Sequence, residues 1–243
     1  MKIMENLIKE NWTHESAGEL DAVLAQHSTP QYRKFSEGIV NTKMTVLGVR
    51  MPVLRQIVKA IAKGDVASFL DNVPTDSLEK AMIHGLLITE LKDENKAIKH
   101  FNKFLPFIDN WAVCDTVCLD FKLIGKDKEK HFQYVSELAQ CESEFISRAG
   151  LILLLKFYRE VRFFNRVFGL LDSINSDLYY VNMASAWLIA EYFLVDGERT
   201  KEYLKENKLN NFTHNKAIQK IRESFRVNAE TKKELTALKR NKR

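Results

Sequence analysis

The stretch "FIDNWAVCDTVCLDF", residues 107–121, contains the residue types in this chain best suited to chemistry. It is mostly apolar, yet it places one acid, Asp115, one helical turn after Trp111 and between Cys114 and Cys118. A carboxylate that shares a helix face with an indole is costly to desolvate unless a partner compensates for it. Three arrangements explain the acid from the residues alone: a metal site, a structural ion pair, or a catalytic carboxylate.

A metal site at this stretch would have too few ligands. A zinc ion in a protein needs about four ligands, the third cysteine, Cys141, lies well beyond the stretch, and none of the six histidines shows ligand spacing. We therefore predict that Cys114 and Cys118 are small core residues, with no metal and no other cofactor. The chain also has no nucleophile elbow and no glycine-rich phosphate loop, and Gly48 of "LGVR" is most simply interpreted as a turn.

The composition favours a helical protein. Nine Gly and four Pro in 243 residues are few, whereas an all-β fold needs many turn residues. No apolar run reaches about 18 residues, the N-terminus lacks the pattern of a secretory signal, and an odd number of cysteines suits a reducing compartment. We expect a cytoplasmic, monomeric, all-α protein that folds as a single domain over residues 1–243.

Several segments have apolar residues spaced as on one face of a helix. These segments are 78–92, 95–108, 129–140, 145–158, 163–174 and 181–194. Pro52 suits the first turn of a further helix that ends near Gly64. Residues that can cap a helix start recur at Asp76 (with Glu79 three residues on), Asn110, Ser143, Asp177 and Thr213, in steps of 34, 33, 34 and 36 residues.

This period predicts stacked helix pairs, that is, an α-solenoid of HEAT-like repeats in which equivalent helices line one concave wall. Asp115 lies five residues after the cap at Asn110, and Arg148 lies five after the cap at Ser143. These two residues are therefore expected to be neighbours on the same wall. Trp111 shares the face of Asp115, and Trp187 belongs to the next wall helix.

The resulting cluster of Trp111, Asp115, Arg148 and Trp187 has two interpretations. It is either an ion pair that joins two repeats, or a binding surface that faces the groove. A buried ion pair adds little net stability, and the neighbouring apolar residues already supply a core face. The aromatic residues beside the pair therefore favour the binding surface, with the acid exposed on the wall.

Four separated landmarks in this order resemble the DNA alkylation repair enzymes of the AlkD type, which are HEAT-like-repeat DNA glycosylases. The landmarks are "LGVRMPVLRQIVKAI", "DNWAVCDTV", the Arg of "FISRAGLILL" and the Trp of "NMASAWLIAEYF". The resemblance extends from about Tyr32 to the C-terminal helices. It implies that Trp111, Asp115, Arg148 and Trp187 form the catalytic site. The chain departs from the better-known branch at Asn182 and Ala190, where basic residues are expected beside the second Trp.

The implied substrate is double-stranded DNA that carries cationic N3- or N7-alkylated purines. Cleavage of the glycosidic bond builds positive charge on the sugar, which the Asp115 carboxylate would stabilise while it orients water. The indoles of Trp111 and Trp187 would add cation–π stabilisation, and Arg148 would hold a backbone phosphate. One alternative function is a catalytically weak or inactive DNA-binding solenoid that recognises distorted or branched duplex, and another is a protein-interaction solenoid with no role on DNA.

The positive charge of the chain lies near its C-terminus. The net charge is +5, and residues 201–243 hold 13 Lys and Arg against 5 Asp and Glu. A basic tail over about residues 229–243 suits either a solvated, partly disordered end or attraction to phosphates. With the resemblance, we predict that Lys216, Lys220 and Arg222 contact DNA, together with Arg50 and Arg148.

Overall fold

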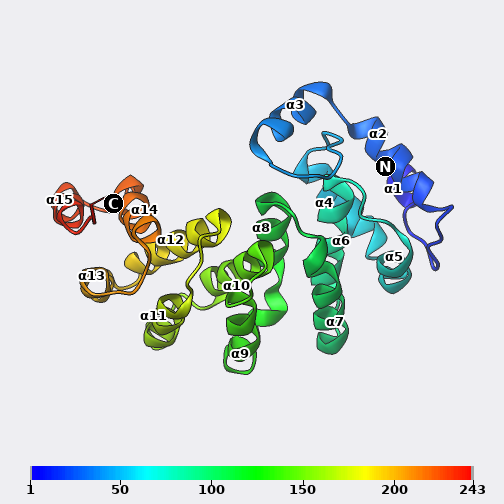
Figure 1. Ribbon diagram of the computed structural model, residues 1–243. Helices are drawn as coiled ribbons and strands as arrows, with labels where there is room; N and C mark the ends of the chain where they lie inside the picture. The colour runs from blue at the N-terminus through cyan, green and yellow to red at the C-terminus, as the bar shows by residue number, and fades with distance from the viewer. Residues whose placement is uncertain (1, 242–243) are drawn as a thin grey trace. The chain divides into compact units, whose positions relative to one another are not determined.

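The structure is a computed structural model that describes residues 2–241, and its regular elements in that range are helices (Figure 1). No β-strand occurs there, and the one strand-like pairing is an isolated bridge between Thr45 and Ser77. The all-α prediction is therefore confirmed. The α-helices are α1 (Lys2–Glu5), α2 (Ala17–His27), α3 (Pro30–Ile39), α4 (Met51–Ile61), α5 (Val66–Asn72), α6 (Leu78–Glu90), α7 (Glu94–Phe104), α8 (Trp111–Asp120), α9 (Lys128–Ala139), α10 (Glu144–Phe157), α11 (Phe164–Ser173), α12 (Tyr179–Phe193), α13 (Gly197–Lys205), α14 (Asn211–Glu223) and α15 (Ala229–Ala237).

Three short 3₁₀ segments complete these elements: η1 (Leu105–Phe107), η2 (Lys122–Gly125) and η3 (Val161–Phe163). The six segments predicted from apolar spacing correspond to α6, α7, α9, α10, α11 and α12. Pro52 lies in the first turn of α4, where its missing N–H costs no hydrogen bond. No helix within residues 2–241 is long and apolar enough to cross a membrane.

The helix starts repeat, with small shifts from the predicted positions. The N-cap residues of α6, α8, α10, α12 and α14 are Ser77, Asn110, Ser143, Leu178 and Asn210, in steps of 33, 33, 35 and 32 residues. Asn110 and Ser143 are confirmed as caps. The predictions of Asp76, Asp177 and Thr213 are wrong by one, one and three residues. Ser77 and Asn210 take the cap because their side chains accept hydrogen bonds from the N–H groups of Lys80 and Thr213.

The chain divides into two compact units, Met1–Leu123 and Ile124–Arg243. In unit 1, α4 packs on α6 and α6 packs on α8. Gly85 makes the second contact close, because a Cβ atom there would lie 2.2 Å from Cγ2 of Val117. The wall helices of unit 1 therefore stack in chain order, as an α-solenoid requires.

Unit 2 has the same arrangement, with α10 packed on α12 and α12 packed on α14. A Cβ atom at Gly150 would lie 2.2 Å from the backbone nitrogen of Ala139, so α9 and α10 also approach closely. Equivalent tyrosines join successive repeats: Tyr158 donates to the carbonyl of Lys128, and Tyr192 donates to the carbonyl of Tyr158. A concave face shared by both units, and a single domain over residues 1–243, stay predictions.

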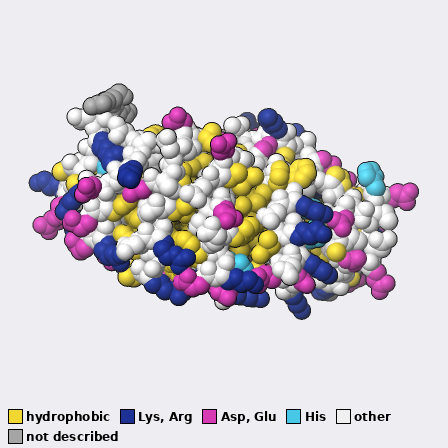
Figure 2. All heavy atoms as spheres, turned by 60° about the horizontal axis from the view of Figure 1, so that its bottom comes forward, with side chains coloured by type: hydrophobic (Ala, Val, Ile, Leu, Met, Phe, Trp, Pro, Cys, Tyr) yellow, Lys and Arg dark blue, Asp and Glu magenta, His cyan; other side chains and the backbone are white. Residues whose placement is uncertain are grey.

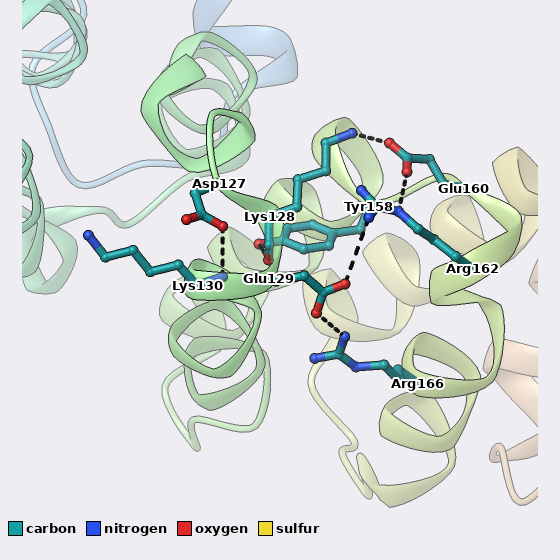
Figure 3. A network of polar contacts seen from close by, with 8 residues as sticks. All are labelled: Asp127, Lys128, Glu129, Lys130, Tyr158, Glu160, Arg162 and Arg166. Atoms are coloured by element: carbon teal, nitrogen blue, oxygen red, sulfur yellow. Dashed lines mark hydrogen bonds and ion pairs between the residues drawn. The ribbon is translucent and has the colours of Figure 1, made fainter.

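Polar side chains on α9 and around η3 form a network that also joins successive repeats (Figure 3). Glu160 accepts hydrogen bonds from Lys128 and Arg162, and Glu129 pairs with Arg162 and Arg166. In the view of Figure 2, basic and acidic side chains are interspersed, with hydrophobic side chains visible between them. Surface ion pairs contribute little stability each, so the network of Figure 3 is best explained as a solvated contact between repeats.

The C-terminal segment is more ordered than a solvated tail. Its first nine residues form α15, and Arg240 donates to the carbonyls of Leu209 and Asn207 at 2.6 and 2.9 Å. Asn215 exchanges two hydrogen bonds with the backbone of Arg240. Residues 229–237 are therefore helical and Arg240 is hydrogen-bonded to residues 207, 209 and 215, whereas Lys242 and Arg243 lie outside the described residues.

Candidate functional site

Helix α8 carries the first two predicted site residues. The side chain of Asn110 is fully buried and accepts a hydrogen bond of 2.9 Å from the N–H of Val113, which fixes the start of the helix. Trp111 is the first helical residue and is half-buried, and Asp115 follows one turn later. Asp115 is only 9% exposed, so the prediction that it stands open on the wall is wrong. Its carboxylate lies in a site largely shielded from water.

The two cysteines of α8 point into the core. Cys114 and Cys118 are both 0% exposed, which confirms their prediction as core residues. Among residues 2–241, no three His, Cys, Asp or Glu side chains lie close enough together to hold a metal ion.

Trp111 is held by the C-terminal end of α3. Its indole Nε1 donates a hydrogen bond of 3.1 Å to the carbonyl of Ile39, the last residue of α3. Three and four residues after Ile39, Thr42 and Lys43 donate hydrogen bonds to the carboxylate of Asp109, two residues before Trp111. The orientation of the indole is therefore set by contacts that lie far away in the sequence.

The same connection between α3 and α4 is held at α6 by a buried acid. Glu79 is 2% exposed, and its two carboxylate oxygens accept hydrogen bonds from the backbone N–H groups of Leu47, Gly48 and Val49 at 3.0, 2.7 and 3.1 Å. Gly48 has a φ of +91°, which confirms the predicted turn. Glu79 therefore orders the loop that leads to Arg50.

Arg50, a predicted DNA contact, is exposed at the start of α4. Its guanidinium carbon lies 4.9 Å from the centre of the Tyr32 ring. This stacking holds the side chain while its polar edge stays accessible. A role for Arg50 in DNA binding stays a prediction.

In unit 2, Arg148 and Trp187 lie on α10 and α12, which pack against each other. Arg148 is 7% exposed, and its Nη1 donates a hydrogen bond of 3.0 Å to the carbonyl of Tyr180. Its guanidinium carbon lies 5.8 Å from the centre of the Tyr180 ring. Trp187 is half-buried. Arg148 therefore joins two repeats as well as being a candidate phosphate ligand.

Asn182 and Ala190, where the resemblance leads us to expect basic residues, are both buried on α12. Asn182 donates to the carbonyl of Ser176 at 3.0 Å and accepts from the side chain of Asn210 at 3.2 Å. A cation at position 182 would lose these hydrogen bonds and would be buried among them. The hydrogen bonds of the buried Asn182 therefore explain why unit 2 has no basic residue at position 182.

The three predicted DNA contacts on α14 are all half-buried. Lys216 lies with its ammonium 5.8 Å from the centre of the Phe212 ring and 3.0 Å from Oε1 of Gln219. Lys220 is one turn further along the same face, whereas Arg222 is displaced around the helix and its Nε is buried without a partner among the described residues. The structure thus brings Lys216 and Lys220 onto one face, and their role stays a prediction.

Sequence reasoning missed a repeating aromatic signal. An aromatic residue occupies one of the first two positions of each wall helix from α8 to α14: Trp111, Phe145, Tyr179 with Tyr180, and Phe212. In unit 2 they touch from repeat to repeat, with ring centres 5.2 Å apart for Phe145 and Tyr180 and 6.0 Å apart for Tyr179 and Phe212. The spacing of about 34 residues could have revealed this series.

The structure places two of the four predicted site residues in each unit. Trp111 and Asp115 share α8 in unit 1, and Arg148 and Trp187 lie on adjacent helices in unit 2. The cluster of all four stays a prediction. Chemically, the first pair offers a shielded anion beside an aromatic ring, and the second offers a cation beside aromatic rings.

Comparison with protein families gives one match. The family model described as "DNA alkylation repair enzyme" matches residues 20–221, which is most of the chain and includes both pairs. No individual curated protein matches the chain.

Proposed function

The chain belongs to the DNA alkylation repair enzyme family, and from that premise we propose that it is a DNA glycosylase of base excision repair. The proposed reaction is hydrolysis of the N-glycosidic bond of cationic N3- or N7-alkylated purines in duplex DNA. The observation that carries the proposal is the shielded carboxylate of Asp115, 9% exposed, one turn from the half-buried indole of Trp111.

An alkylated purine that carries a positive charge is already a good leaving group. When its bond to C1′ breaks, the electron pair goes to the base, which leaves neutral, and positive charge develops on the sugar. A fixed carboxylate stabilises that charge most strongly where water is excluded. Asp115 supplies it and orients the water that adds to C1′, and the proton that this water loses passes to the solvent. No general acid is needed, because the base leaves without being protonated.

The remaining site residues act on the sugar and the backbone. The indole faces of Trp111 and Trp187 stabilise the cationic sugar by cation–π interaction. Arg148 holds a backbone phosphate, and its hydrogen bond to the carbonyl of Tyr180 keeps the guanidinium in place. Lys216, Lys220, Arg222 and Arg50 contact further phosphates of the duplex.

The test is release of methylated purine from alkylated duplex DNA by the wild type and by Asp115→Asn. Loss of one preorganised electrostatic group typically costs about 10²- to 10³-fold in rate, so Asp115→Asn should release base at least about 100-fold more slowly. The matched control is Asp120→Asn, which removes an acid from the other end of the same helix, where it pairs with Arg55 at 2.6 Å. Equal release by the wild type and Asp115→Asn would refute the proposal.

A second candidate function is favoured by the buried Asn182 and Ala190, which leave no cation at those two positions beside Trp187. It is a catalytically weak or inactive DNA-binding protein that recognises distorted or branched duplex. It predicts salt-sensitive binding to such duplexes, no base release, and unchanged or stronger binding by Asp115→Asn.

A further inference from the structure

A clamp between two distant segments of unit 1 fixes the start of α8. Asp109 accepts hydrogen bonds at Oδ1 from the hydroxyl of Thr42, at 2.7 Å, and at Oδ2 from the backbone N–H of Lys43, also at 2.7 Å. Its Oδ1 also accepts from the side chain of Asn110 at 2.9 Å. Thr42 is itself fixed, because its hydroxyl oxygen accepts from the N–H of Met44 at 3.0 Å.

The clamp acts on Trp111 through the residues just before Thr42. The last carbonyl groups of a helix have no partner within it, and one of those at the end of α3, Ile39, accepts the indole N–H of Trp111 at 3.1 Å. Only two residues lie between Ile39 and Thr42, so the position of the acceptor depends on the clamp. The side chain of Ile39 is 48% exposed, so apolar packing contributes little to holding it in place.

The hydrogen bond to Ile39 also determines what Trp111 offers a ligand. An indole has a single donor, Nε1–H, and no acceptor. Since that donor is used within the protein, Trp111 is left with its aromatic face, which attracts positive charge. This side chain therefore suits a cationic or electropositive group better than a group that needs a hydrogen-bond donor.

We propose that Asp109 is a positioning residue that, through Thr42 and the Ile39 carbonyl, aims the aromatic face of Trp111 at the electropositive sugar of the substrate. This inference rests on the proposed glycosylase function and adds a residue that does not touch DNA. A misplacement of a site group by about 1 Å costs about 10²-fold in rate. Asp109→Asn should therefore lower kcat by about 10-fold or more, while duplex affinity stays within about twofold.

The experiment follows the indole directly as well as the reaction. The chain has three tryptophans, so ¹⁵N-labelled protein gives three indole N–H signals, and Trp111→Phe identifies the one from Trp111. In Asp109→Asn, only that signal should shift and its hydrogen exchange should speed up. Thr42→Val removes the same link without changing the charge and should have the same effect on the signal. Asp120→Asn is the control on the same helix and should leave the Trp111 signal unchanged.

The outcomes separate this inference from the glycosylase proposal. An unchanged Trp111 signal in both Asp109→Asn and Thr42→Val would overturn the clamp, whatever the activity. A shifted signal with unchanged kcat would overturn the positioning role. If the wild type releases no base, the glycosylase proposal fails on its own and takes the positioning role with it, while the indole signals still decide whether the clamp exists. If Asp109→Asn unfolds, Thr42→Val decides.

Discussion

Replacing Glu79 by Gln tests how the loop that carries Arg50 is held. The carboxylate is 2% exposed and accepts three backbone N–H groups, two of them at Oε1 and one at Oε2. A carboxylate is the right partner for three donors because it only accepts. Gln has the same shape, but one of its two terminal groups is NH₂, which is a donor. In the variant this group would lie opposite a backbone N–H, which is also a donor.

The cost can be worked from these contacts. If the Gln carbonyl takes the place of Oε1, the hydrogen bonds from Gly48 and Val49 survive but lose the charge, at about 1 kcal/mol each. The N–H of Leu47 loses its acceptor, which costs about 1–3 kcal/mol for a buried donor. The expected loss in the free energy of unfolding is therefore about 4 kcal/mol. At about 2–4 °C per kcal/mol for a protein of this size, Tm should fall by about 8–16 °C.

The assay is thermal unfolding followed by circular dichroism, together with hydrogen exchange at the three loop amides. Exchange at residues 47–49 should speed up in the variant even where the rest of unit 1 stays protected. The matched control is Glu90→Gln at the other end of α6, an exposed acid near a helix C-terminus, where its negative charge is unfavourable. It should leave Tm unchanged or slightly raised. A Glu79→Gln protein that melts within about 2 °C of the wild type, with protected loop amides, would refute the reasoning.

Two further perturbations test the packing and the pH response. Gly150→Ala should destabilise by about 1–3 kcal/mol, because its Cβ would lie 2.2 Å from the backbone nitrogen of Ala139, whereas Gly169→Ala on α11, with no atom within 4 Å, should stabilise by about 0.5–1 kcal/mol in urea unfolding. Burial lowers the pKa of His84 from 6.5 to about 4, so the folded state favours the neutral ring. The neutral ring therefore makes its full contribution to the free energy of unfolding above about pH 6.5. Up to about 3 kcal/mol of that free energy is lost as the pH falls towards 4, because the unfolded chain binds a proton that the folded chain does not. His84→Phe keeps the stack on Phe104 and should remove that part of the pH dependence of stability measured by urea unfolding. If the wild type and His84→Phe show the same dependence of unfolding free energy on pH, His84 is not its source.

Local patterns were sufficient for the period and for the helices from α6 to α12, but they did not predict α2, α3, α5 or α13. In the helices from α6 to α12 the apolar residues lie on the face that packs against a neighbouring helix. Their spacing can therefore be recognised within each segment, without knowledge of the rest of the fold. Cap positions were less secure, since Asp76 and Ser77 are both good cap residues and only the chain geometry selects Ser77. The aromatic residues at the starts of α8, α10, α12 and α14 also recur about every 34 residues in the sequence. A repeat search based on cap residues alone does not detect them.

The three acids near the starts of α6 and α8 show why the site itself was harder to predict. Glu79, Asp109 and Asp115 all resemble acids that favour a helix N-terminus or pair across a wall. In the folded chain, Glu79 binds the loop at 47–49, Asp109 binds Thr42 and Lys43, and Asp115 is nearly buried. Every one of the partners that sets Glu79 or Asp109 apart lies at least 30 residues away, in a loop with no regular pattern.

The burial of Asp115 changes what its replacement should do. Periodicity gives the position of an acid along a helix, but its depth depends on side chains from other segments, so an exposed wall residue was the natural expectation. An acid that is 9% exposed must have its desolvation offset by the fold. Asp115→Ala is therefore expected to alter stability as well as activity, and the isosteric Asp115→Asn is the cleaner test of chemistry. The same shielding that makes the residue costly to bury strengthens its attraction for a cationic sugar, so stability and catalysis at this position are expected to be linked.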